Sequence, residues 1–69
     1  MKMKTETMNA LIETYLNGNI QEARKGFKRA TAREIREGLI EACYSFKKAT
    51  LTAEFLKTGE GYQIACDAD

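Results

Sequence analysis

Six cationic side chains lie close together in the middle of the chain and form its strongest concentration of one chemistry. They are Arg24, Lys25, Lys28, Arg29, Arg33 and Arg36. Residues 21–36 hold six basic and two acidic side chains, a net charge of +4, whereas residues 37–69 hold three basic and six acidic ones, a net charge of −3. Guanidinium and ammonium groups at this density neutralise the carboxylates or phosphates of a partner. The separation of charge predicts a basic face that orients an acidic partner.

Residues suited to catalysis are sparse. The chain has no histidine, and Glu34, Glu37 and Glu41 follow the spacing of a solvated helix face rather than that of a carboxylate pair held in a cleft. Gly59 and Gly61 do not have the spacing of a phosphate-binding loop. We therefore expect a protein that is not an enzyme and that has no cofactor.

The two cysteines, Cys43 and Cys66, are too few for a zinc site or a disulfide framework. Cys43 follows Ile35 and Leu39 at helical spacing, which predicts a small buried hydrophobe on the apolar stripe of its helix. A bridge between the two cysteines would close a long loop, but cytosolic thiols stay reduced. We expect no metal site.

Helix-start signals indicate how the chain positions these side chains. Asn19, Thr31 and Ser45 each precede an apolar periodic segment, and Thr5 is a fourth candidate. Asn19 and Thr31 are each followed three residues later by glutamate, which is the capping-box arrangement. The chain has no proline. We predict an all-α fold, a compact bundle of four to five short helices in a single domain over residues 1–69.

Apolar residues recur at helical spacing over four segments. The predicted helices cover residues 5–17, 20–30, 32–43 and 46–57. Residues 1–4 are expected to be frayed, and residues 60–69 are expected to form a short C-terminal turn or tail. Gly18 and Gly59 are expected to end the first and fourth helices in the left-handed conformation. Gly26 either weakens the second helix or marks close packing against a neighbour.

The fourth predicted helix, over residues 46–57, is apolar on two sides. Its main stripe consists of Phe46, Ala49, Ala53 and Leu56. Leu51 and Phe55 lie roughly opposite, and a helix with two apolar sides is normally buried on both. Either this helix is central in the bundle, or its second side meets another molecule through an apolar interface of Leu51, Phe55 and Tyr62. A homodimer joined through Leu51 and Phe55 is one form of the second alternative.

Residues 35–56 also have the arrangement of a helix–turn–helix, with the helix from Phe46 as the reader. The stretch 41–49 resembles the turn region of small phage terminase and regulator domains, where a glycine usually precedes the tyrosine and where this chain has Cys43. The cations of the reader helix are Lys47, Lys48 and Lys57. It lacks arginine, asparagine and glutamine, the usual side chains for base contacts. Because of this helix–turn–helix arrangement, a small nucleic-acid-binding regulator is the alternative function, and the missing side chains place it second.

In length and helical make-up the whole chain resembles the short helical accessory proteins of phages and plasmids, including anti-CRISPR and anti-restriction inhibitors. The resemblance implies a cytoplasmic binding protein that occupies a surface on a larger host protein or ribonucleoprotein complex. The six cations would then be the partner-binding face, and reversing the charge at Lys25, Lys28 and Arg29 is expected to abolish binding. The apolar runs are too short for a membrane span, so no membrane partner is expected.

Overall fold

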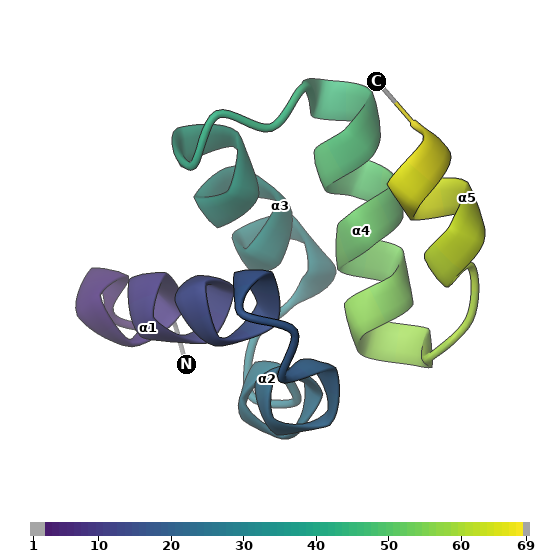
Figure 1. The fold of residues 1–69 in the computed structure, drawn as a ribbon. Helices are drawn as coiled ribbons and strands as arrows, with labels where there is room; N and C mark the ends of the chain where they lie inside the picture. The colour runs from purple at the N-terminus through teal and green to yellow at the C-terminus, as the bar shows by residue number, and fades with distance from the viewer. Residues whose placement is uncertain (1–2, 69) are drawn as a thin grey trace.

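The computed structural model describes residues 3–68 and folds them into five helices (Figure 1). These are α1 (Thr5–Leu16), α2 (Ile20–Phe27), α3 (Ala32–Glu41), α4 (Phe46–Thr58) and α5 (Tyr62–Asp67). This part of the chain contains no strand, so the all-α prediction is confirmed. α2 ends three residues earlier than predicted and α3 ends two residues earlier. The predictions for residues 1, 2 and 69 lie outside the described residues.

Helix α4 lies at the centre of the bundle. It contacts α2, α3 and α5, and Figure 1 shows α3 and α5 on opposite sides of it. Ala49 and Ala53, on the main apolar stripe, are 0% and 1% exposed. Of the two alternatives for a helix with two apolar sides, the structure therefore has the central position.

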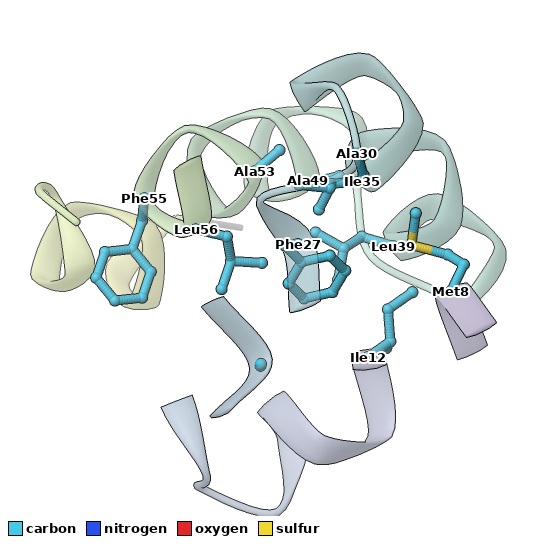
Figure 2. Packing of buried hydrophobic residues seen from close by; sticks show 11 residues of the cluster. Met8, Ile12, Phe27, Ala30, Ile35, Leu39, Ala49, Ala53, Phe55 and Leu56 are labelled. Carbon is cyan, nitrogen blue, oxygen red and sulfur yellow. The ribbon is translucent and has the colours of Figure 1, made fainter. Parts of the chain in front are cut away.

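The core surrounds the ring of Phe27, which has no exposed surface. Figure 2 shows this ring among side chains of α1, α3 and α4, including Ile12, Leu39 and Leu56. Full burial of a large apolar side chain stabilises a fold by about 1.5–3 kcal/mol. One aromatic side chain thus connects four of the five helices.

Two glycines allow α1 to approach its neighbours closely. A Cβ at Gly26 in α2 would collide with the end of the Leu11 side chain, and a Cβ at Gly38 in α3 would lie 2.7 Å from Cγ of Met8. Both positions therefore lack a side chain because α1 packs directly on the backbone there. Of the two alternatives predicted for Gly26, the structure therefore has close packing against a neighbouring helix.

Most of the predicted helix ends are confirmed. The Thr31 side chain accepts the backbone N–H of Glu34 at 3.1 Å, and the Glu34 carboxylate accepts the N–H of Thr31, so the capping box is complete. The Ser45 hydroxyl accepts a backbone N–H at the start of α4. Gly18 and Gly59 have φ values of 90° and 83° and follow α1 and α4 in the left-handed conformation.

The capping box predicted at Asn19 is wrong. The backbone N–H of Asn19 donates to the carbonyl oxygen of Thr14 at 3.1 Å, in the turn that ends α1. Because this donor is already engaged, Glu22 cannot complete a box, and the Asn19 side chain makes no cap hydrogen bond. Thr5 is also not a cap: it is the first residue of α1, and Lys4 holds the cap position.

The predicted burial of Cys43 is also wrong. Cys43 has a left-handed φ of 74°, and the N–H groups of Cys43 and Tyr44 donate at 3.0 Å to the carbonyl oxygens of Ile40 and Leu39. This is the Schellman turn, which ends α3 at Glu41. Since Cys43 lies beyond the helix, helical spacing no longer places its side chain, and the thiol is exposed.

The two ends of the described chain pack onto the bundle. The backbone N–H of Met3 donates to Oε2 of Glu34 at 2.8 Å, and its side chain packs against the core. The described part of the predicted frayed tail, residues 3–4, is therefore ordered against α3. At the other end, α5 provides the predicted C-terminal turn and buries Ala65 at 1% exposure.

Candidate functional site

The six predicted cations differ in their exposure and in their contacts within the chain. Arg24 and Arg36 are half-buried, whereas the other four are exposed. Within residues 3–68, three of the six side chains make a hydrogen bond, an ion pair or a cation–π contact, and three make none of these. This difference decides which of them are available to a partner.

Arg24 points at the C-terminal end of α4. Its Nε donates to the carbonyl oxygen of Leu56 at 3.4 Å, and its guanidinium lies against Gly59. In return, Nζ of Lys57 in α4 donates to the carbonyl oxygen of Ala30 at 2.6 Å and to two further carbonyl oxygens of the same turn at 3.3 and 3.4 Å. Each cation satisfies carbonyl groups that a helix end leaves unpaired. Arg24 is therefore engaged within the fold, and its place in a partner-binding face stays a prediction.

Arg36 and Arg33 are also engaged within the chain. The Arg36 guanidinium lies over the ring of Phe46, 5.1 Å from its centroid. Phe46 was expected in the buried stripe but is 64% exposed, because the side chain of the first helical residue projects past the N-terminal end of the helix. Nε of Arg33 lies 3.5 Å from Oε1 of Glu37 in an exposed ion pair.

Lys25, Lys28 and Arg29 are the remaining three, and we call them the α2 cation surface. All three side chains are exposed, and within residues 3–68 none of them takes part in an ion pair. Their spacing of three and four residues places them on one side of α2 and of the turn that follows it. Their positive charge is therefore open to a partner.

The predicted apolar interface is mostly part of the fold. Phe55 is only 7% exposed and packs against Tyr62, with ring centroids 5.0 Å apart and planes inclined at 56°. Leu51 is half-buried, whereas Tyr62 is 44% exposed. Because α5 covers Phe55, that residue cannot anchor a partner without moving α5.

A groove that sequence reasoning missed runs between α1, α4 and α5, with a volume of about 280 Å³. Its lining includes all three tyrosines of the chain together with Leu16, Lys48 and Cys66. Tyr15, Tyr44 and Tyr62 come from three different parts of the chain, so no local spacing signals their convergence. We call this site the tyrosine groove.

The tyrosine hydroxyls of this groove stay protonated well above neutral pH. Burial, with the neighbouring Tyr44, Cys66 and Tyr62, raises the pKa of Tyr15 to about 12. Burial and Cys66 raise the pKa of Tyr44 as well. A hydrogen bond with Cys66 raises the pKa of Tyr62. The groove therefore presents hydroxyl donors beside one ammonium group.

A second hollow of about 140 Å³ lies between α1 and α3 and is lined by Glu34, Glu37 and Glu41. The Glu34 carboxylate accepts backbone N–H groups, and Glu37 pairs with Arg33. Over residues 3–68 no group of three or more histidine, cysteine or carboxylate side chains is arranged to hold a metal ion. Over the same residues, no helix has both the length and the apolar character needed to cross a bilayer.

Comparisons with protein-family models, with curated proteins and with solved structures give no match to this chain.

Proposed function

We propose that this chain is a non-catalytic binding protein whose α2 cation surface docks on an acidic surface of a larger protein or ribonucleoprotein. The observation that carries the proposal is the unneutralised charge of Lys25, Lys28 and Arg29. Among the six central cations these three alone extend into solvent without a contact inside residues 3–68. Lys25 lies in the last turn of α2, and Lys28 and Arg29 follow its end, where the helix dipole favours cations. Because their side chains are exposed, their charge also attracts groups of opposite charge on a partner.

The size of the molecule fits this role. A standard protein interface buries about 800 Å² on each partner, which is about a sixth of the 4765 Å² surface of this chain. One side of the bundle around α2 is large enough for such an interface. Residues 21–36 carry a net charge of +4 and residues 37–69 a net charge of −3, and a charge separation of this kind speeds correctly oriented encounters.

We further propose that binding inhibits the partner. This part of the proposal rests on the resemblance in length and helical make-up to inhibitors of phages and plasmids. A helical body without catalytic machinery acts on a larger complex by covering a surface that the complex needs. The origin in a mobile element belongs to the same proposal.

The experiment is a comparison of two doubly charge-reversed variants. The tagged chain is incubated with bacterial lysate, and retained proteins are identified by mass. Lys25→Glu with Lys28→Glu is expected to lose the retained partner. Lys4→Glu with Lys47→Glu changes the net charge equally at two exposed lysines away from α2 and is expected to keep it. Equal loss in both variants would contradict docking through α2.

Nucleic-acid binding is the second candidate, and one observation favours it. Residues 28–31 join α2 to α3, and a connection of four residues has the length of the turn in a helix–turn–helix. The side chain of Arg33, in the first turn of α3, is 78% exposed. The pair expected from sequence, α3 and α4, is disfavoured because α4 packs against α2, α3 and α5, which leaves less of its surface for a nucleic acid. Glu37 and Glu41 on α3 would oppose phosphates, so this candidate ranks second. It predicts a gel-retardation shift that weakens steeply with salt.

A further inference from the structure

We propose that the tyrosine groove is a peptide-binding site for an extended, proline-containing segment that carries a carboxylate. This site shares no residue with the α2 cation surface, so it stands independently of the function proposed above. Its ligand class follows from three features: aromatic walls, hydroxyl donors and a single positive charge.

The aromatic walls are held in place by the fold. Tyr15 and Tyr44 are half-buried and pack against the core, and the Tyr62 ring is held by Phe55 at 5.0 Å. Rings that are fixed before binding lose little conformational entropy when a ligand docks. An aromatic-lined groove of this kind suits a polyproline II segment, which is itself preorganised.

The hydroxyl groups match the backbone of such a segment. A polyproline II helix has no internal hydrogen bonds, so its carbonyl oxygens need donors. Tyr15 and Tyr44 line the groove with hydroxyls that remain protonated at neutral pH, because burial raises the pKa of both. The groove therefore offers donors to a ligand that lacks them.

Lys48 provides the charge complement. Its Nζ lies 5.5 Å from the centroid of the Tyr44 ring, and within residues 3–68 it has no carboxylate partner. Among the described residues that line the groove, Lys48 is the one charged side chain. A carboxylate on the ligand would pair with it at the edge of the aromatic walls.

The single charge of the groove disfavours single-stranded nucleic acid as its occupant. Single-stranded nucleic acid is held by several cations along its backbone. Among the described residues that line the groove, only Lys48 is charged.

The first test maps binding on the isotope-labelled full chain by NMR. The probe is a short peptide in which proline and glutamate alternate. Its controls are the same peptide with lysine for glutamate, the same peptide with alanine for proline, and an oligothymidylate. We expect the proline–glutamate peptide alone to shift the amide signals around Tyr15, Tyr44 and Tyr62. Absence of those shifts, or stronger binding of the oligothymidylate, would overturn the proposal.

The second test uses a matched pair of neighbouring lysines. Lys48→Glu is expected to weaken the proline–glutamate peptide about tenfold, because it reverses the charge inside the groove. Lys47→Glu makes the same change at an exposed position that does not line the groove and is expected to change affinity less than about twofold. Equal weakening by both variants would overturn the site, and circular dichroism of each variant confirms that the helices persist.

Discussion

The ammonium group of Lys57 donates a 2.6 Å hydrogen bond to the carbonyl oxygen of Ala30. Lys57 lies in the last turn of α4, and Ala30 lies just after α2, so this bond joins two helix ends. Arg24 makes the reciprocal contact from α2 to the end of α4. Two residues that sequence spacing places among surface cations therefore act as caps between helices.

Removing the Lys57 ammonium group is expected to destabilise the fold. Lys57→Met keeps most of the apolar stem but removes the ammonium donor to the carbonyl oxygens of Lys28 and Ala30, whereas the carbonyl oxygen of Phe27 still accepts the backbone N–H of Ala30. We expect a loss of about 1 kcal/mol in the free energy of unfolding. Lys47→Met is the control, because the Lys47 side chain is exposed and donates no hydrogen bond within residues 3–68. Urea titration measures both. The same loss in the two variants would show that the cap contributes nothing.

Replacing Cys43 by glycine is expected to stabilise the turn between α3 and α4. Cys43 holds a φ of 74°, which costs about 1–2 kcal/mol for a residue with a Cβ. Glycine removes this cost but gains entropy in the unfolded chain, so the expected net increase in the free energy of unfolding is about 0.5–1 kcal/mol. Cys43→Ala keeps the Cβ and should change little. A destabilised Cys43→Gly variant would refute the left-handed turn.

The hydroxyl of Thr52 is a removable cost in the core. Thr52 is 1% exposed, and its Oγ1 has no hydrogen-bond partner within residues 3–68. Thr52→Val replaces the hydroxyl by a methyl group of similar size and is expected to raise the free energy of unfolding by about 1 kcal/mol. Thr50 is the matched control, since its Oγ1 donates to the carbonyl oxygen of Phe46 at 2.8 Å. Calorimetry of Thr50→Val should show no increase in the free energy of unfolding. An increase for Thr50→Val but not for Thr52→Val would contradict the cost assigned to the Thr52 hydroxyl.

Stability is expected to fall at alkaline pH through Tyr15. Burial raises its pKa to about 12 in the folded state from the ordinary value of 10.0 for tyrosine, so folding favours the neutral phenol. The resulting stabilisation is fully present below pH 10 and is lost as the pH rises toward 12. Tyr15→Phe removes the ionisable group and should show a smaller alkaline loss in urea titrations. Parallel curves for the two proteins would contradict the burial of this hydroxyl.

Local signals in the sequence predict most of the helix boundaries. The caps at Thr31 and Ser45 and the left-handed glycines at Gly18 and Gly59 are confirmed because each depends on a few neighbouring residues. The two apolar sides of α4 predict either a central helix or an interface, and its contacts with α2, α3 and α5 decide for the central place. The capping box at Asn19 fails because the turn that ends α1 already engages the backbone N–H of Asn19.

The candidate sites were less predictable because they depend on contacts between distant residues. Nothing near Arg24 in the sequence indicates that it reaches Leu56, and nothing near Arg36 indicates that it covers Phe46. The tyrosine groove likewise joins Tyr15 with Tyr62 across most of the chain. Sequence spacing predicts the helix face on which a charged or aromatic residue lies. The packing of the helices around α4 then decides which of these residues face solvent.

Docking through the α2 cation surface is best tested by the affinity of the captured partner for the two doubly charge-reversed variants. The dissociation constant is measured at two salt concentrations for the natural chain, for Lys25→Glu with Lys28→Glu, and for Lys4→Glu with Lys47→Glu. We predict that the first variant binds at least about a hundredfold more weakly and that the second binds within about threefold of the natural chain. An unchanged constant for Lys25→Glu with Lys28→Glu would contradict the proposed function.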